Sequence, residues 1–523
     1  MKKSFYFLAL SVFTLCTMFS CASKDTPSEV IPSDVAMVVK FDIKRLALKA
    51  DYKTENNKML RDYIDKIDNS ELKELVKSCL KNPNAIGLKV LGKAYLFCNN
   101  DGTIGISMAV DNSKKFYENL IKIEASTKEN IKVDGGVYSM VYPSSSVSMA
   151  WDSKNIVIIV DPQNQQGQTS AKDISDMLKM EHDKSFAATP NYTKLSASDN
   201  DIVAYISMGK LSKFYIDQLK RTSSHLAMDS VSKDVIDSDL QSVYDDNNYY
   251  STIVSCNFEN GKIISKMNIF FETPEDEARF NSMAANKTVL KGNLNKYVGE
   301  NNIMYFAANI DGNAVASSID SNKMNILNKL APVLGNLDYK KLISVFNGDI
   351  FATFNRLNIS SVNNPLVFSI FATVDKTKAA EFFEFILAKD REKKINKIAD
   401  NTYSFNGIFF GIKDDIFYYT NDSIDYARLL QGGVENRSLN NIIGQPLYFG
   451  GSFVPLKEQL MPLVQQGSPF YDVAQYALGM ISTFSSNATD RYNYTFEVNF
   501  TDTKTNSLHQ IFTLIDKVIG VII

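Results

Sequence analysis

Short apolar runs alternate with amphipathic stretches along most of the chain, and turn residues separate them. Residues 92–111 contain two apolar runs joined by the turn sequence NNDG at 99–102, which predicts a β-hairpin. The apolar residues of 113–126 recur with helical spacing, and 137–161 contains three short strand-like runs. Because the strands come as hairpins and meanders, the pattern predicts an α+β protein whose antiparallel sheets carry helices on one side.

The same order of elements begins again in the second half of the chain. The run PLVFSIFATVDKTKAAEFFEFI matches GTIGISMAVDNSKKFYENLI, so that Val374 corresponds to Val110. Six elements recur in one order, which predicts an internal duplication. We expect two related halves, at 34–290 and 296–523, each with an antiparallel or meander sheet packed against helices. The alternative is that any α+β chain shows such an alternation.

The C-terminal run LHQIFTLIDKVIGVII is apolar, but Asp516 and Lys517 interrupt it. A membrane-spanning helix needs about 20 apolar residues, and this run is shorter. Its helical spacing predicts a helix that docks on the protein core.

The N-terminus has the pattern of a secretion signal. Lys2 and Lys3 precede a short apolar run, and Ser20 stands directly before Cys21. This pattern is typical of bacterial lipoproteins, and it predicts cleavage between Ser20 and Cys21, a signal peptide at 1–21 and acylation of Cys21. The alternatives are an ordinary secretion signal, which prefers an A-x-A-like end that is missing here, and an uncleaved anchor. Cys16 is a poorer acceptor because a leucine precedes it.

Residues 22–33 are small, polar and contain proline, which predicts a flexible tether. Several acyl chains on one cysteine anchor a protein stably in a lipid bilayer. Ala22 is not an aspartate, which by resemblance to other lipoproteins argues against retention in the inner membrane. We therefore expect an exported protein anchored to the outer membrane, in its periplasmic or its surface leaflet.

The lipoprotein signal, the tether leading into IPSDVAMVVKFDIKRLALKA and the later strand–hairpin–helix order are similar to a family of Bacteroidetes lipoproteins described as domain of unknown function 4836. The resemblance covers most of the chain. It implies an anchored, exported protein and brings no catalytic residues with it.

Composition and charge exclude one class of partner. The 523 residues carry a formal net charge of −3 and show no basic stripe, so nucleic-acid binding has no electrostatic support. Processing would leave three of the five cysteines, Cys79, Cys98 and Cys256. An exported protein could pair two of them, but their spacing resembles neither a disulfide framework nor a zinc site, which favours buried free thiols.

Motifs for catalysis are missing from the sequence. Three histidines are too few and too scattered for a histidine-rich metal site, and no G-x-S-x-G motif marks a nucleophilic serine at a strand-to-helix turn. Ser70-Glu71-Leu72-Lys73 and Ser198-Asp199-Asn200 have the order used by penicillin-recognising enzymes, but no K-T-G follows. Ser70 is better interpreted as a helix cap. The acidic stretch at 245–248 is interpreted as a solvated turn rather than a calcium loop. We predict no metal and no cofactor.

Two weaker signals concern the surface. Three aromatic pairs on strands could place rings outward as a platform for glycans or peptides, although packing is the simpler interpretation: Tyr249-Tyr250, Phe409-Phe410 and Tyr418-Tyr419. Ser230 and Ser423 each follow an aspartate in a motif that resembles the O-glycosylation acceptor of exported Bacteroidetes proteins.

The leading hypothesis is a non-enzymatic lipoprotein that binds or scaffolds something at the cell envelope, with the bilayer, envelope proteins or glycans as partners. The alternative is an envelope hydrolase, directed at glycans, with paired carboxylates in the cleft between the halves; carboxyl groups roughly 5–9 Å apart would favour it. A third hypothesis is a subunit of a nutrient-uptake or surface assembly, which a large exposed apolar patch would support.

Overall fold

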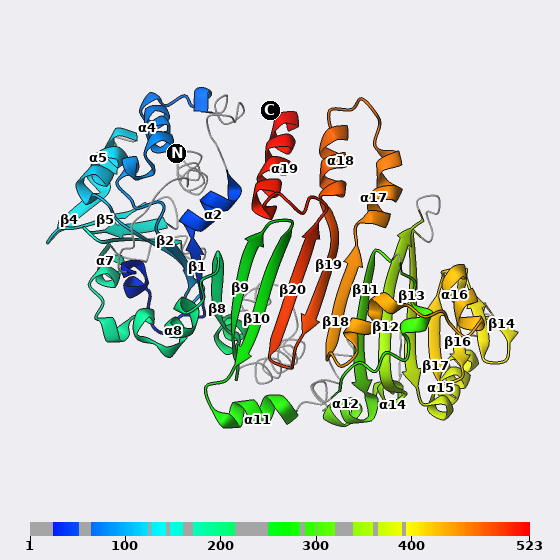
Figure 1. Ribbon diagram of the computed structural model, residues 1–523. Coiled ribbons are helices and arrows are strands. Elements are labelled where there is room, and N and C mark those ends of the chain that lie inside the picture. The colour runs from blue at the N-terminus through cyan, green and yellow to red at the C-terminus, as the bar shows by residue number, and fades with distance from the viewer. Residues whose placement is uncertain are drawn as a thin grey trace. The chain divides into compact units, whose positions relative to one another are not determined.

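The chain divides into two compact units, which are described separately (Figure 1). Unit 1 comprises Met1–Leu226, Asp246–Ile269 and Lys504–Ile523, and unit 2 comprises Ala227–Asp245 and Phe270–Thr503. The computed structural model describes residues 25–51, 64–123, 127–142, 147–160, 171–214, 249–282, 288–300, 302–319, 338–358, 365–389 and 394–522.

Unit 1 is built on one sheet in the order β10-β9-β8-β1-β2-β3-β7-β6-β5-β4. All pairings from β9 to β4 are antiparallel. The strands are β1 (Met37–Asp42), β2 (Lys93–Cys98), β3 (Ile104–Ala109), β4 (Ile131–Asp134), β5 (Val137–Val141), β6 (Val147–Trp151), β7 (Asn155–Val160), β8 (Ile202–Ser207), β9 (Ser251–Glu259) and β10 (Lys262–Phe270).

Unit 2 repeats this order as β20-β19-β18-β11-β12-β13-β17-β16-β15-β14, again with antiparallel pairings. Its strands are β11 (Met304–Asp311), β12 (Phe346–Leu357), β13 (Leu366–Val374), β14 (Asn396–Ala399), β15 (Thr402–Phe405), β16 (Ile408–Lys413), β17 (Ile416–Thr420), β18 (Leu447–Ser452), β19 (Ile481–Ala488) and β20 (Asn493–Phe500). The predicted α+β class with antiparallel sheets is confirmed.

Helices of both units connect the strands. In unit 1 they are α2 (Ile43–Ala50), α4 (Ser70–Lys81), α5 (Ser113–Ile123), α6 (Thr127–Asn130), α7 (Ala171–Leu178), α8 (Pro190–Ser196), α19 (Ser507–Ile522) and the 3-10 turns η1 (Thr26–Val30), η2 (Pro83–Ile86), η3 (His182–Lys184) and η4 (Phe186–Ala188). In unit 2 they are α11 (Pro274–Ser282), α12 (Gly312–Ser318), α14 (Tyr339–Ser344), α15 (Lys376–Lys389), α16 (Ser423–Leu430), α17 (Val454–Leu460), α18 (Tyr471–Met480) and the turns η6 (Asn295–Tyr297), η8 (Arg437–Ile442) and η9 (Met461–Leu463).

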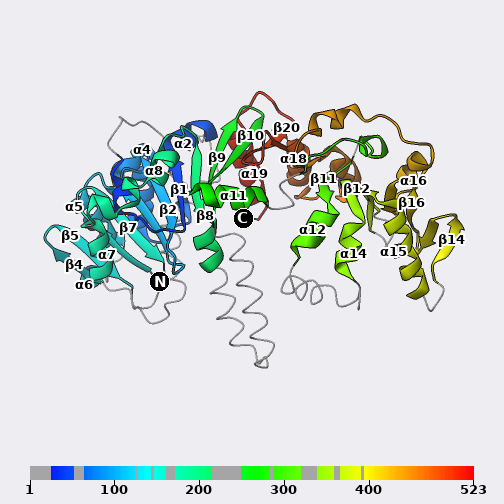
Figure 2. The same ribbon diagram turned by 90° about the horizontal axis from the view of Figure 1, so that it is seen from below.

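The expectation that helices lie on one side of each sheet is wrong. In unit 2, Phe371 and Ala372 are adjacent on β13 and fully buried, and they belong to different hydrophobic clusters. One cluster contains Phe383 of α15, and the other contains Leu429 of α16 (Figures 1 and 2). Because successive strand residues point to opposite faces, both faces of this sheet are covered. The largely apolar sequence of β13, LVFSIFATV, is the sequence signal for this burial.

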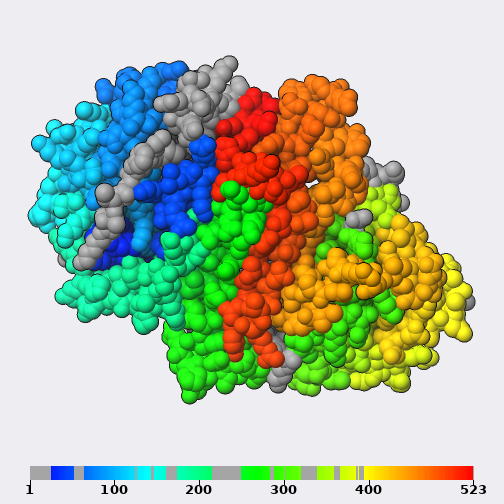
Figure 3. Space-filling view, in the orientation of Figure 1, coloured from blue at the N-terminus to red at the C-terminus, as the bar shows by residue number. Residues whose placement is uncertain are grey.

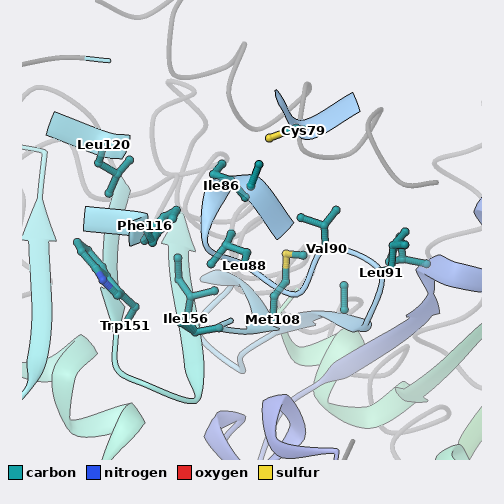
Figure 4. Close-up of a cluster of buried hydrophobic side chains, with 14 of the residues drawn as sticks. Cys79, Ile86, Leu88, Val90, Leu91, Met108, Phe116, Leu120, Trp151 and Ile156 are labelled. Atoms are coloured by element: carbon teal, nitrogen blue, oxygen red, sulfur yellow. The ribbon is translucent and has the colours of Figure 1, made fainter. Parts of the chain in front are cut away.

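The core of unit 1 packs α2, α4 and α5 against one face of its sheet (Figure 4). Phe116 of α5 meets the fully buried Trp151 edge-on, with ring centroids 5.2 Å apart. On the opposite face of β3, the hydroxyl of Ser107 donates a hydrogen bond to the carbonyl of Pro27 in η1. Thus the second face is covered by the N-terminal segment.

The segment 25–33 is part of this fold, although the sequence pattern assigned it to the tether at 22–33. Val30 and Ile31 are buried, and the Phe186 amide donates to the carbonyl of Ile31 at 2.7 Å. Asp25 accepts hydrogen bonds through Oδ2 from the hydroxyl of Tyr95, at 2.5 Å, and from two further side chains, Lys93 and Tyr192. The segment is mostly polar, so its composition predicted a tether, although its few apolar side chains pack on unit 1.

The C-terminal helix α19 also differs from the predicted division at 296–523, because residues from Lys504 onward belong to unit 1. The helix packs on α2 and β9, and Nδ1 of His509 lies 2.6 Å from the carbonyl oxygen of Ala50. The predicted docking on a core is therefore observed. Among the described residues, no helix is long and apolar enough to cross a membrane.

Candidate functional site

Most site residues predicted from the sequence lie outside the described residues. These are Ser20 and Cys21 of the proposed cleavage site, Ser230, and the acidic stretch at 245–248. Ser423 is described: it is the exposed first residue of α16. Cys79, Cys98 and Cys256 are free thiols, as the spacing favoured.

Other sequence candidates have structural roles. Ser70 begins α4, but the cap is the preceding Asn69, whose side chain accepts a hydrogen bond from the Leu72 amide. None of the six rings in the three aromatic pairs is exposed. Phe409, for example, stacks on Tyr426 with ring centroids 4.4 Å apart. The aromatic pairs therefore belong to packing and do not form an outward platform.

A cavity of about 520 Å³ lies within unit 2. Its wall comes from the end of β12, the N-terminal turn of α16, the loops that precede β11 and η8, and α17. Cavities that bind small ligands commonly measure about 300–1,000 Å³. Residues of α16 and the following loop, coloured yellow to orange, lie on the face seen in Figure 3. This cavity is the candidate functional site.

The start of α16 places three charged residues of the cavity wall. Asp422 is the helix cap, and its Oδ1 accepts from the Ile424 amide at 2.9 Å. Asp425 and Arg428 follow at intervals of three residues, a spacing that puts side chains on one face of a helix. Both carboxylates are buried, at 3% side-chain exposure each.

One asparagine at the end of β12 joins the two carboxylates. Nδ2 of Asn355 donates to Oδ2 of Asp422 and to Oδ2 of Asp425, both at 2.7 Å. The hydroxyl of Ser369 donates to the same oxygen of Asp425 at 2.7 Å, and it also lies 2.8 Å from the hydroxyl of Thr420. The carboxylates are thus held close together by neutral donors from the neighbouring strands β12 and β13.

Each carboxylate also has its own arginine. Arg356 contacts Asp422 with both terminal nitrogens, at 2.9 and 3.3 Å. Arg428 donates to Oδ1 of Asp425 at 2.5 Å and to the carbonyl of Tyr297 at 3.5 Å. Two buried negative charges are therefore compensated by two positive charges, as buried ion pairs require.

Burial raises the pKa of the Asp425 carboxyl group. Hydrogen bonds from Ser369 and Asn355 oppose this shift, the neighbouring Asp422 adds to it, and Arg428 opposes it. Desolvation is thus the largest influence on Asp425, which is the behaviour expected of a carboxylate taken out of water.

Two amide atoms at this cavity have no hydrogen-bond partner among the described residues. They are Oδ1 of Asn355 and Nδ2 of Asn302, and both residues line the cavity. Asn355 is 6% exposed and Asn302 is 4% exposed. Leaving a buried polar atom unpaired costs about 1–3 kcal/mol, so a folded protein rarely retains one without a reason.

The arrangement can offer hydrogen bonds to a ligand. Among the described residues, no group of histidine, cysteine, aspartate and glutamate side chains could hold a metal ion. Asp422 and Asp425 form a close carboxylate pair inside unit 2, whereas the hydrolase hypothesis placed its pair in the cleft between the halves. Sequence reasoning noticed Asp422 only as the neighbour of Ser423. The three-residue spacing of Asp422, Asp425 and Arg428 was the sequence signal that could have indicated this site. No sequence pattern indicated the contribution of Asn355.

Comparisons with known proteins give a family but no activity. No curated protein matches the chain. Crystal form IV of TP0453 is similar at 14% identity over 46% of this chain and 79% of its own, with a TM-score of 0.25. Crystal form I of TP0453 gives 10% identity over 48% and 81%, with the same TM-score. Scores this low carry no argument about fold or function. The family described as Domain of unknown function (DUF4836) matches residues 28–431, so the chain belongs to this family.

Proposed function

We propose that this protein is a lipid-anchored lipoprotein of the cell envelope that binds a ligand in the cavity of unit 2 and does not transform it. The leader with Ser20 before Cys21 supports the anchor. Ala22, which by resemblance to other lipoproteins argues against retention in the inner membrane, supports an outer-membrane location.

The observation that carries the binding role is the state of the cavity wall. Asp422 and Asp425 each bond to an arginine and to Asn355, so neither carboxylate is free to attack a substrate or to activate water. The side chain of Arg356, which is 40% exposed at this wall, retains N–H donors beyond the two that contact Asp422 and can offer them to a ligand. These features support a cavity that binds a ligand without transforming it.

A second candidate is hydrolysis, and the raised pKa of Asp425 favours it. A buried carboxyl group with a raised pKa can serve as a general acid, and Asp422 would be its partner. If this is the function, purified protein will release new reducing ends from neutral oligosaccharides, and Asp425→Asn will abolish the release. Intact oligosaccharides after prolonged incubation would exclude it.

Metabolic labelling with palmitate tests the anchor. We expect the wild-type protein to incorporate the label and to fractionate with the outer membrane, and Cys21→Ala to lose both. Cys16→Ala is the matched control, because it removes the other cysteine of the leader and should still be labelled. Continued labelling of Cys21→Ala would show that Cys21 is not the acylated residue.

A ligand-induced rise in melting temperature tests the cavity. The probes are uncharged trisaccharides, sialyllactose, trilysine and trialanine, each added to the wild type and to Asn355→Ala. A probe that stabilises only the wild type supports a binding cavity. If no probe class distinguishes the two proteins, the binding role of this cavity is rejected.

The matching strand orders also support an internal duplication. β1 and β11 pair with β2 and β12 so that Asn99 and Asn355 occupy equivalent positions, each directly after the residue paired with the first strand residue. The Oδ1 atoms of both asparagines find no hydrogen-bond partner in the part of the chain that the structure describes. An alignment of many family members in which the columns of β1–β8 are no more similar to those of β11–β18 than to shuffled columns would contradict a duplication.

O-glycosylation at Ser423 and Ser230 also belongs to the proposal. The exposure of Ser423 supports it, since an acceptor hydroxyl must be accessible. Intact-mass measurement of the mature protein should show added sugar that Ser423→Ala and Ser230→Ala reduce, and an unmodified mass would end the idea.

A further inference from the structure

We propose that one edge of the unit 1 sheet is a membrane-docking surface, which the acylated Cys21 holds against the lipid headgroups. This edge, called the anchor edge, is where β1 and β3 end and where β2, β7 and β8 begin. The inference rests on the lipid anchor proposed above and goes beyond it, because it assigns unit 1 a fixed orientation on the bilayer in place of free movement on a tether.

The folded chain begins only four positions after the lipid-bearing cysteine, at Asp25. Oδ2 of Asp25 accepts hydrogen bonds from the hydroxyls of Tyr95 and Tyr192, at 2.5 and 3.0 Å. The same oxygen accepts from Nζ of Lys93 at 3.1 Å. The side chain of Asp25 is 15% exposed, and Tyr95 is fully buried. Asp25 is therefore a fixed point of unit 1 and not part of a flexible linker.

The length of chain between these two residues limits how far unit 1 can lie from the bilayer. An extended chain spans at most about 3.3–3.6 Å per residue, so the α-carbons of Cys21 and Asp25 are no more than about 14 Å apart. The headgroup region on each side of a bilayer is about 5–7 Å thick. Because the acyl chains lie in the hydrocarbon core, about half of the available length is used in crossing the headgroups. Unit 1 must then lie against the bilayer surface.

The docked N-terminal segment runs along β2 from the anchor edge toward the opposite edge. Asp25 contacts Lys93, the first residue of β2, and the Ala36 amide donates to the carbonyl of Cys98, the last residue of this strand. The chain therefore enters unit 1 from the anchor edge. The turn at 99–102 lies at the opposite edge, six residues or about 20 Å further along β2, which exceeds the reach of the anchor.

The exposed charges of the anchor edge also suit a bilayer surface. The segments that join the strands at this edge are 42–45, 92–93, 110–115, 152–154 and 198–201. Their exposed charged residues are four lysines and two aspartates: Lys93, Lys114, Lys115, Lys154, Asp111 and Asp199. Asp199 is also paired with Arg45 at 2.6 Å. The anchor edge thus carries an excess of positive charge, which anionic headgroups attract, although the whole chain has a net charge of −3.

Quenching of a fluorophore by nitroxide-labelled lipid headgroups tests the docking. The acylated protein is reconstituted into vesicles of phosphatidylethanolamine and phosphatidylglycerol, with one maleimide fluorophore at Ser153→Cys or at Asn100→Cys. Ser153 is an exposed residue of the anchor edge, and Asn100 is an exposed residue of the opposite edge. The fluorophore at position 153 should lose most of its emission, and the fluorophore at position 100 should lose little. Protein without an introduced cysteine gives the background from the native thiols.

A lengthened tether is the matched control. Inserting about twenty glycine and serine residues between Lys24 and Asp25 keeps the lipid anchor and allows a separation of about 25 Å, so quenching at position 153 should fall to the level at position 100. Circular dichroism checks that each variant is folded. Equal quenching at the two positions, or quenching that the insertion leaves unchanged, would overturn docking by a short tether and leave the anchor intact. Protein that does not float with the vesicles would reject the anchor and the docking together.

Discussion

Replacing Asp425 by alanine would remove one carboxylate from the cavity wall and leave Arg428 without its ion-pair partner. The Arg428–Asp425 contact is 2.5 Å long, and the two side chains are 21% and 3% exposed. Asp425 also accepts from Asn355 and Ser369, both at 2.7 Å. The change therefore removes an acceptor from three donors at once.

The magnitude follows from which donors find another partner. Ser369 can turn to the hydroxyl of Thr420, 2.8 Å away, and Asn355 keeps Asp422. Arg428 keeps only the long contact with the carbonyl of Tyr297 among its described hydrogen bonds. Removing one member of a buried ion pair costs about 3–5 kcal/mol, so we expect Asp425→Ala to lower the free energy of unfolding by that amount.

A double variant separates the loss of the pair from the loss of one charge. With Asp425→Leu and Arg428→Met together, no uncompensated charge remains, and replacing a buried ion pair by apolar residues is often close to neutral. Asn355 then lacks one acceptor, which costs about 1–3 kcal/mol. The double variant should therefore be more stable than Asp425→Ala.

Urea unfolding followed by far-ultraviolet circular dichroism measures these free energies. If the slope of the unfolding free energy against urea concentration is unchanged, the shift of the urea midpoint gives the change in stability. The control is Asp472→Ala, which removes an exposed acid of α18 and should change stability by no more than about 0.5 kcal/mol. A loss below about 1 kcal/mol for Asp425→Ala, typical of an exposed pair, would refute the reasoning that the wall is a buried network.

Four other outcomes are expected. Because its folded pKa is raised, protonated Asp425 contributes stability below the ordinary carboxyl pKa of roughly 4, and this contribution is lost as pH rises through the folded pKa; the stability of the wild type relative to Asp425→Asn should thus fall as pH rises above about 4, and a flat difference in urea titrations would contradict it. Asp25→Ala should remove the Asp25 carboxylate that accepts from the buried Tyr95 hydroxyl and speed proteolysis within 25–33, and an unchanged cleavage rate would show that this hydrogen bond does not hold the segment on unit 1. Gly87 has φ +100° and its added Cβ would lie 2.6 Å from the Phe116 backbone nitrogen, so Gly87→Ala should cost more than about 1 kcal/mol in urea unfolding. Burial raises the pKa of the Cys79 thiol to about 11, so Cys79 should react with a disulfide reagent at pH 8 far more slowly in the folded than in the unfolded protein, and equal rates would disprove its burial.

Local sequence patterns predicted the elements well. The turn at 99–102 joins β2 and β3 as expected, and the helical spacing of 113–126 contains α5. Alternation of apolar and polar residues is a local property, so it can be recognised without knowledge of the fold. The pattern of the C-terminal run also predicted a docked helix, which is α19.

Division of the chain was predicted less well, because it depends on contacts between distant residues. The polar segment at 25–33 is held by Phe186 and Tyr95, which are far away in sequence. Likewise, α19 returns to α2 and β9 of unit 1. No local pattern indicates which sheet a terminal segment will join.

What the sequence by itself determined is the class of fold, the order of strands and helices, the candidate leader ending at Cys21 and the lack of familiar catalytic motifs. Only the tertiary structure decided that Asp422 and Asp425 meet Asn355, and that Asp422 meets Arg356, both of which precede them by more than sixty residues. The physical reason is that a binding site depends on burial and on which hydrogen bonds remain unmade. Both are properties of packed neighbours, and neither is encoded at any single position of the chain.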